Sequence, residues 1–258
     1  IVDIKKEPKS ILIHMSTALI RSTVIKKLKF DPKLKVSEDT KLLYEIILQK
    51  EKYGILASSI YHYRKRKDGS SAVQTSSNKR DWYIDTIKYC HDYLIKLSIK
   101  KYGTIIPYVQ HFIMYNLQWR IKTKIADNLT DKEKEEYVNT MKRYLRLIDD
   151  DIILFQKQMK NSYKLLALKV KYGKELEKYI TNRKDGIYFK ERLLIPYKSI
   201  TSNVQLAHIE KEKLILEGNI ILYDFPLYYA INGEKKEKID VYLKNTIDSI
   251  FEPEYDVK

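Results

Sequence analysis

The hydrophobic and polar positions in the N-terminal part of the chain repeat mainly with the period of an α-helix. Residues 16–28 carry apolar side chains near helical spacing. Residues 38–51 carry a clearer set after Ser37, a residue type that favours the helix N-cap. Two short apolar runs differ: residues 11–15 predict a buried strand or the lead into a helix, and residues 55–63 predict a strand. The pattern therefore predicts helices mixed with strand-like segments.

The middle of the chain predicts longer helices. Helical spacing covers residues 78–102, and Gly103 is a typical residue to end such a helix. A second helix is expected from Thr104 to about Ala126, with a proline tolerated in its first turn. Thr130-Asp131-Lys132-Glu133 is a capping box, and the three-four alternation that follows continues to Val170. The pattern predicts one helix of roughly forty residues, about 60 Å long.

After Gly173 the apolar runs become short and are separated by turn residues, which indicates β-strands. Asn232-Gly233 is typical of a hairpin turn and predicts pairing of residues 227–231 with residues 239–243. Short strands at close spacing indicate a β-sandwich-like module. The fold class is therefore α+β, and the expected divisions of the chain are residues 1–77, 78–182 and 183–258.

Composition limits the classes of protein to which the chain can belong. Lys and Arg total 49 against 34 Asp and Glu, and the net charge of +15 favours anionic partners such as nucleic acid, an acidic membrane surface or a phosphate-rich substrate. The single cysteine, Cys90, excludes an internal disulfide framework and indicates a reducing compartment. The sequence contains no apolar run long enough to predict a membrane-spanning helix. Because the chain begins at Ile1 without Met, we expect it to be a segment of a longer chain.

Two adjacent carboxylates, Glu38 and Asp39, follow Ser37 at the start of a predicted helix. Acidic residues in a first helical turn often serve only to complement the helix dipole. The alternative is catalytic: Asp39 would be a general base, taking a proton from an acceptor hydroxyl as that oxygen attacks a sugar carbon opposite the leaving group. Glu38 would orient Asp39 or contact the acceptor. The residues alone leave both interpretations open.

A basic, serine-tipped segment, residues 61–71, includes the end of the predicted strand. Seen alone, it is most simply a solvated turn. The alternative is a clamp for a diphosphate, because Arg side chains offer planar pairs of donors and a loop serine adds a short hydroxyl donor. An acidic pair followed by such a loop would hold a hydroxyl acceptor and an anionic leaving group together.

Taken in order, these residues resemble the C-terminal part of the catalytic GT-A domain of family 2 glycosyltransferases, above all bacterial enzymes of teichoic acid and capsule assembly, some of them fused to a glycerophosphotransferase. The resemblance covers residues 12–72, about a quarter of the chain. The helices and the β module that follow are similar to accessory and linker regions of wall-polymer transferases. The matching residues are His14, Arg21, Phe30-Asp31, Ser37-Glu38-Asp39-Thr40, Tyr61-His62-Tyr63-Arg64-Lys65-Arg66 and Ser70-Ser71.

The resemblance implies roles for these residues. In that family the aspartate of the Glu-Asp pair is the catalytic base, which implies this role for Asp39 with Glu38 beside it. The complete domain would use a divalent metal ion (Mg²⁺ or Mn²⁺), a nucleotide-sugar donor, and a polyol-phosphate or polysaccharide acceptor. It would lie at the cytoplasmic face of a Gram-positive membrane, in peripheral contact with anionic lipid. The residues implied for substrate binding are His14, Arg21, Arg64, Arg66, Ser70 and Ser71, with His62 as a candidate metal neighbour.

The chain departs from the family upstream of the Glu-Asp pair. The family's nucleotide-binding half carries a metal-binding Asp-x-Asp, which is absent before Ser37. Asp149-Asp150-Asp151 lies downstream on the predicted long helix and indicates charge on a helix face. We therefore expect most metal ligands to lie outside this chain, and the chain to be inactive alone.

Two rival classes stay open. The first is a basic helical nucleic-acid-binding protein, which the net charge of +15 would suit. The sequence contains no recognised nucleic-acid-binding motif, so we expect no nucleic acid partner. The long helical pattern of residues 131–172 indicates a coiled-coil or scaffold module.

Overall fold

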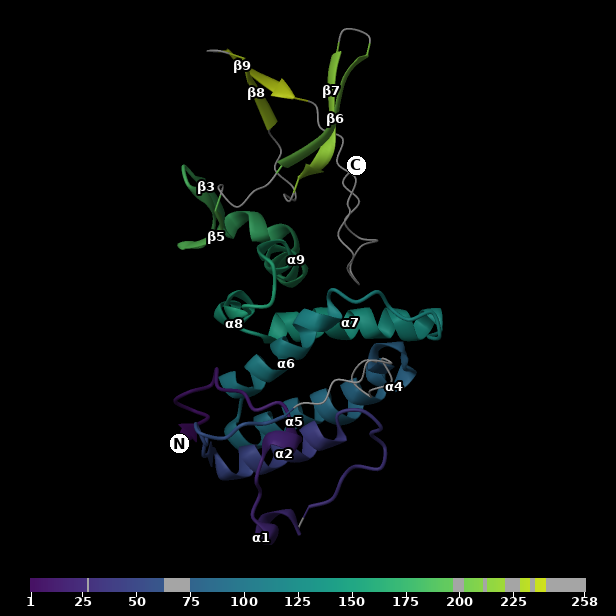
Figure 1. Ribbon diagram of the computed structural model, residues 1–258, viewed down its shortest axis with the longest axis vertical. Helices are drawn as coiled ribbons and strands as arrows, with labels where there is room; N and C mark the ends of the chain where they lie inside the picture. The colour runs from purple at the N-terminus through teal and green to yellow at the C-terminus, as the bar shows by residue number, and fades with distance from the viewer. Residues whose placement is uncertain are drawn as a thin grey trace. The chain divides into compact units, whose positions relative to one another are not determined.

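The computed structural model describes residues 1–26, 28–62, 75–196, 202–210, 213–220, 228–232 and 235–239. Over these ranges the chain mixes helices with small antiparallel sheets (Figure 1). It divides into two compact units, Ile1–Gln156 and Lys157–Lys258. The predicted divisions at residues 77 and 182, the GT-A description and the β-sandwich description stay predictions. In the described part of the chain, every helix is too short or too polar to cross a membrane.

Unit 1 consists of helices that pack on one another in succession. α2 packs against η3 and α5, α5 against α6, and α6 against α7 and α8. A short strand, β1 (Val2–Asp3), pairs antiparallel with β2 (Lys52–Tyr53) and ties the start of the chain to the end of α2. The helices are η1 (Met15–Thr17), α1 (Ser22–Ile25), α2 (Glu38–Lys50), η2 (Ser76–Asn78), α4 (Arg80–Tyr83), the π-helix η3 (Thr86–His91), α5 (Asp92–Tyr102), α6 (Pro107–Arg120), α7 (Asp131–Leu147) and α8 (Asp150–Phe155).

The helix predicted over residues 38–51 is confirmed as α2. Its apolar face is buried through Leu42, Leu43, Ile46, Ile47 and Leu48. The ring of Tyr44, also fully buried, lies 4.2 Å from that of Phe112 and 5.6 Å from that of Tyr108, both on α6. Aromatic pairs of this kind contribute about 0.5–1.5 kcal/mol beyond area burial, so they fix α2 firmly in the core of unit 1.

The helix predicted over residues 78–102 is present but interrupted, because the π-helix η3 separates α4 from α5. Gly103 ends α5 as predicted, in the left-handed conformation with φ 74°, and its N–H donates to the Ile99 carbonyl at 2.8 Å. The next helix, α6, begins at Pro107 rather than at Thr104. Pro suits this first position, because its missing N–H would have no helical partner there.

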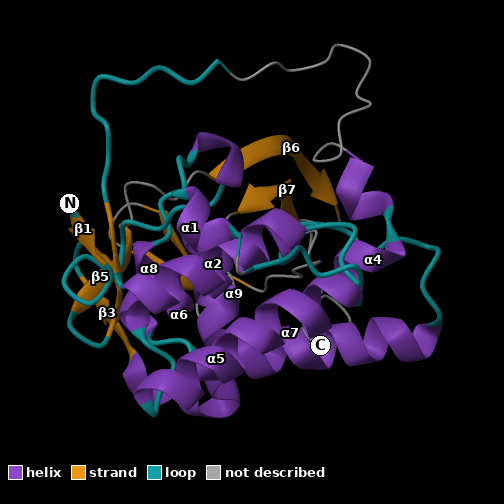
Figure 2. Ribbon diagram, turned by 90° about the horizontal axis from the view of Figure 1, so that it is seen from below, coloured by secondary structure: helices purple, strands orange, loops and turns teal. Residues whose placement is uncertain are grey.

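Two elements predicted near the N-terminus are wrong. Of residues 16–28, the described ones contain only the end of η1 and the short helix α1, and the described residues 55–62 form neither helix nor strand. The described residues 11–14 are likewise irregular. Figure 2 shows the loop after β2 running outside the packed helices. A strand-like or amphipathic pattern forms a regular element only where its apolar face finds a partner, and these segments expose large apolar side chains instead.

The predicted forty-residue helix is also wrong, because it is divided into α7, α8 and α9 (Asn161–Tyr172). Its capping box is confirmed at the start of α7, where Thr130 and Glu133 exchange bonds. At the first break, Asp149 is extended, its N–H donates to Gln110 Oε1 at 2.7 Å, and Gln110 Nε2 donates to Asp149 Oδ2 at 3.2 Å. A glutamine from α6 therefore accepts the backbone bond that the Asp149 N–H would have donated within a continuous helix.

This break changes the interpretation of Asp149-Asp150-Asp151. Asp149 occupies the N-cap position of α8 without a side-chain capping bond, and Asp150 and Asp151 lie in its first turn, where their charge complements the helix dipole. They do not mark the face of a long helix. The continuous helix that indicated a coiled coil is absent from this described stretch.

Unit 2 begins with α9 and the 3₁₀ segment η4 (Gly173–Tyr179), followed by a three-stranded antiparallel sheet. The sheet has the order β3 (Ile180–Arg183), β4 (Gly186–Phe189), β5 (Arg192–Pro196), and α9 packs against β5. Gly186 allows the close approach of β4 to β5, because a side chain there would collide with the backbone of Ile195. β4 and β5 confirm the expectation of short strands after Gly173.

Two further hairpins follow in unit 2. β6 (Ser202–Glu210) pairs with β7 (Lys213–Ile220), and Gly218 lies inside β7, opposite a register shift. The predicted hairpin at Asn232-Gly233 is confirmed, but β8 (Tyr228–Asn232) pairs with β9 (Lys235–Ile239). The partner strand thus begins four residues earlier than predicted, because the short turn sets the register.

Candidate functional site

Glu38 and Asp39 form the first turn of α2, and both side chains are half-buried. Asp39 Oδ1 accepts hydrogen bonds from the Thr40 backbone N–H at 2.7 Å and from the Thr40 hydroxyl at 3.2 Å. Among the described residues, the hydrogen bonds to this carboxylate go to Oδ1. The arrangement fixes the carboxylate without burying it fully.

The turn that leads into α2 is unusual. Ser37 occupies the predicted N-cap position, yet its side chain makes no capping bond and its backbone is left-handed, with φ 68° and ψ 19°. A non-glycine residue in this region is strained by about 1 kcal/mol or more. Upstream, Asp31 Oδ1 accepts from the Lys33 N–H at 3.0 Å, and the Asp31 carbonyl accepts from the Leu34 N–H at 3.0 Å. Leu34 is buried and anchors the turn in unit 1.

An ion pair joins this turn to α2. Lys41 Nζ lies 2.6 Å from Asp31 Oδ2, and the two side chains are only 12% and 20% exposed. The same ammonium lies 4.1 Å from the centre of the Tyr93 ring on α5. The hydrogen bond from Lys41 lowers the pKa of Asp31, so this carboxylate stays ionised at neutral pH.

The helices α4 and η3 form the other side of the turn. The Thr86 hydroxyl donates to the Val36 carbonyl at 3.4 Å, and Lys35 Nζ lies 3.7 Å from Asp81 Oδ2. Burial raises the pKa of Asp85, and its hydrogen bond with Asp81 raises it further. The turn from Asp31 to Ser37 is therefore held from two sides, by α2 and by α4 with η3.

The nearby thiol and phenol are poor candidates for nucleophiles. Cys90 is completely buried, and burial raises the pKa of its thiol to about 12. Burial, together with a hydrogen bond to Glu45, raises the pKa of Tyr93 to about 12. Both groups are therefore neutral at pH 7.

The other predicted site residues are exposed or lie outside the described residues. His14 precedes η1, which packs against α2, and its side chain is exposed. Arg21 immediately precedes α1 and is exposed, as is His62. Arg64, Arg66, Ser70 and Ser71 lie outside the described residues, so their predicted proximity to Asp39 stays a prediction. The described residues contain no cluster of three or more His, Cys, Asp or Glu that could hold a metal ion.

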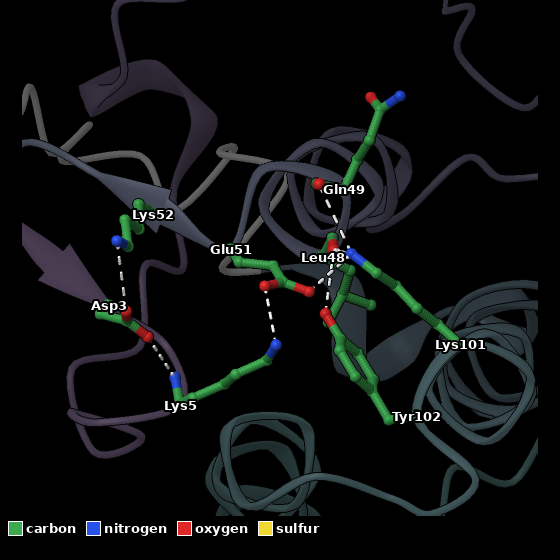
Figure 3. A network of polar contacts seen from close by, with 8 residues as sticks. All are labelled: Asp3, Lys5, Leu48, Gln49, Glu51, Lys52, Lys101 and Tyr102. Atoms are coloured by element: carbon green, nitrogen blue, oxygen red, sulfur yellow. Dashed lines mark hydrogen bonds and ion pairs between the residues drawn. The ribbon is translucent and has the colours of Figure 1, made fainter.

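The opposite end of α2 carries a dense polar network (Figure 3). Glu51 accepts from Lys5 at 2.8 Å and from Lys101 at 2.9 Å, and these hydrogen bonds lower its pKa to about 2. Lys101 also donates to the Leu48 and Gln49 carbonyls, and the Tyr102 hydroxyl donates to the Leu48 carbonyl at 3.0 Å. These carbonyls end α2 and have no partner within the helix, so α5 caps α2.

Sequence reasoning missed the Asp31–Lys41 pair, the left-handed Ser37 and the Glu51 network. Asp31 lies in the Phe30-Asp31 stretch of the resemblance, which could have drawn attention to it. The partner of Asp31 is ten residues away and the partner of Glu51 is fifty residues away, so neither pairing shows in a local pattern.

Two curated relatives are similar to almost the whole chain. The minor teichoic acid biosynthesis protein GgaB of Bacillus subtilis (strain 168) is 32% identical over 248 residues, which is 92% of this chain and 27% of the relative. The minor teichoic acid biosynthesis protein GgaA of the same strain is 28% identical over 249 residues, which is 95% of this chain and 51% of the relative. This chain thus spans about a quarter of one relative and half of the other. No family model matches the chain, and no solved structure matches it significantly.

Proposed function

We propose that this chain is part of an inverting glycosyltransferase of family 2 that acts in the synthesis of a wall teichoic acid. The observation that carries the proposal is the similarity, over more than nine-tenths of the chain, to two proteins named for teichoic acid biosynthesis. The carboxylate that the resemblance implies as the catalytic base, Asp39, is half-buried in the first turn of α2.

In this proposal Asp39 is the catalytic base. Its carboxylate takes the proton of an acceptor hydroxyl through Oδ2, while Thr40 holds Oδ1 in place. The acceptor oxygen forms a bond to the anomeric carbon of the sugar as the bond to the nucleoside diphosphate breaks on the opposite face. The diphosphate leaves with the electron pair of that bond, and the anomeric configuration is inverted. Glu38 contacts the acceptor or orients Asp39.

The exposed apolar segments of unit 1 support the proposal. Leu19 is 92% exposed, Ile60 is 81% exposed, and Ile55 and Leu56 are each about two-thirds exposed. The sequence around Ile55 has the composition of a strand, yet the described residues 55–62 have no partner strand. In this proposal, a nucleotide-binding half of the catalytic domain covers these segments and supplies the sheet that they join.

The proposed site of action is the cytoplasmic face of the bacterial membrane. The net charge of +15 favours contact with anionic lipid and with an anionic polyol-phosphate acceptor. The Tyr-rich helix α6 is an unsuitable surface for that contact, because Tyr108, Phe112 and most of its other apolar residues are buried in unit 1.

The experiment is a transfer assay with the full-length gene product that contains this chain. The purified protein is incubated with a panel of nucleotide-sugars and a poly(polyol phosphate) primer. We expect one donor to release its nucleoside diphosphate and to place a sugar on the primer with inverted anomeric configuration, as measured by NMR. Retention of configuration, or no transfer from any donor, would contradict the proposal. Tight, salt-dependent binding of generic DNA without transfer would favour the nucleic-acid-binding alternative.

A further inference from the structure

The entry to α2 contains three residues, Asp31, Ser37 and Lys41, that contact no substrate in the proposed mechanism. Asp31 and Lys41 form a largely buried ion pair across the turn, with 2.6 Å between Oδ2 and Nζ. Ser37 holds a left-handed backbone directly before Glu38. Each of these features is costly to maintain, because the ions are removed from water and the serine is strained.

We propose that Asp31, Lys41 and Ser37 are positioning residues that set the orientation of the Glu38–Asp39 carboxylates. The effect of these residues on catalysis rests on the proposed function. Their effect on the position of the turn does not depend on that function.

The contacts indicate how the positioning works. Lys41 is the fourth residue of α2, and its backbone N–H donates to the Ser37 carbonyl at 3.0 Å, closing the first helical turn around Asp39. Its side chain extends to Asp31 on the incoming turn and lies over the Tyr93 ring of α5. One residue therefore connects the incoming turn, the first turn of α2 and the neighbouring helix.

The left-handed serine completes this geometry. A usual N-cap residue is extended and caps the helix with its side chain, whereas Ser37 does neither. Its backbone instead turns the chain sharply between the buried Leu34 and the start of α2. Backbone strain of this kind persists where surrounding contacts enforce it, and such sites are frequent beside catalytic groups.

The first test compares Asp31→Asn with a matched control, Asp92→Asn. Asp92 also loses an ion pair, since its Oδ1 lies 2.7 Å from Arg143 Nη2, but it joins α5 to α7 rather than the entry of α2. In the full-length protein, we expect Asp31→Asn to raise amide hydrogen exchange at Leu34 and Lys41 by at least about tenfold. We expect the Asp92→Asn protein to keep wild-type exchange at those two amides. Unchanged exchange in Asp31→Asn would overturn the positioning role.

The second test isolates the backbone of residue 37. Glycine adopts a positive φ without strain, whereas a β-branched residue does so at high cost. We expect Ser37→Gly to keep the wild-type exchange at Lys41 and Ser37→Val to raise it. Equal exchange in the glycine and valine proteins would overturn the role of Ser37.

Activity separates failure of this inference from failure of the proposed function. If the wild-type protein transfers sugar, we expect Asp31→Asn to lower kcat by about tenfold or more with the donor KM unchanged. We expect Ser37→Gly and Asp92→Asn to retain kcat. If Asp31→Asn keeps the wild-type kcat, the catalytic consequence is wrong. If the wild-type protein transfers no sugar, the proposed function fails, and the exchange measurements still decide whether these residues position the turn.

Discussion

The two ends of α2 differ in how their charged groups are satisfied. At the C-terminal end, Glu51 is shared by Lys5 and Lys101, and α5 donates hydrogen bonds to the final carbonyls. At the N-terminal end, Glu38 and Asp39 stay half-buried behind a strained serine, and the nearby ion pair involves Asp31 instead. The comparison teaches that one end of a helix can be stabilised by a network of ion pairs and hydrogen bonds while the carboxylates at its other end stay partly exposed.

The largest expected loss of stability comes from Lys101→Met, which breaks the C-terminal network. The change removes the donor to the Leu48 and Gln49 carbonyls and one partner of Glu51. Because Lys101 is partly exposed, we expect the free energy of unfolding to fall by only about 1 kcal/mol. Urea unfolding measures this change. An unaltered midpoint would mean that the network contributes nothing to stability.

A second prediction concerns pH. The pKa of Glu51 is lowered from 4.5 to about 2 in the folded state, so its contribution is present above pH 4.5 and is lost as the pH falls toward 2. We expect Glu51→Gln to weaken the dependence of Tm on pH over this window. If Tm depends on pH in the same way in the Glu51→Gln and wild-type proteins, the ion pairs of Glu51 do not contribute to stability in this pH range.

Two histidines should add acid sensitivity at higher pH. Burial lowers the pKa of His91 well below 6.5, and it lowers the pKa of His111 to about 4. Below about pH 6.5 these two imidazoles bind protons in the unfolded chain but stay neutral in the folded chain. The free energy of unfolding should therefore fall as the pH drops below about 6.5. We expect His111→Gln to reduce this loss between pH 6.5 and 4, as measured by urea unfolding at each pH. If the free energy of unfolding of His111→Gln falls between pH 6.5 and 4 as much as that of the wild type, His111 does not cause the acid sensitivity.

The smallest expected effect on stability is that of Glu38→Gln. Glu38 lies in the first turn of α2, where a negative charge complements the helix dipole. Its removal should cost about 0.5 kcal/mol, measurable as a small shift in the urea midpoint that disappears at high salt. A shift as large as that of Lys101→Met would show that the N-terminal end of α2 is also structurally locked.

The sequence predicted best those elements whose signals are local. The periodicity of α2, the capping box of Thr130 and Glu133, and the end of α5 at Gly103 all depend on residues within a few positions. The break at Asp149 could not be predicted in this way, because it depends on Gln110 from a different helix. The strand expected over residues 55–63 failed for a similar reason, since a strand needs a partner that no local pattern identifies.

The candidate site was predictable only in part. The positions of Glu38 and Asp39 at a helix start followed from Ser37 and the apolar period of α2. The left-handed backbone of Ser37 was not predictable, because serine ordinarily caps a helix in the extended conformation. The basic residues of the predicted diphosphate clamp lie outside the described residues and stay a prediction.

The most direct test of the account measures Tm and sugar transfer together for Asp39→Asn and Glu51→Gln in the full-length protein. We expect Asp39→Asn to keep its Tm and its donor binding while transfer falls by about 10²- to 10⁴-fold, the usual range for loss of a general base. We expect Glu51→Gln to lower Tm while kcat is retained. If Asp39→Asn transfers sugar at a rate close to that of the wild type, Asp39 is not the base and the central claim is wrong.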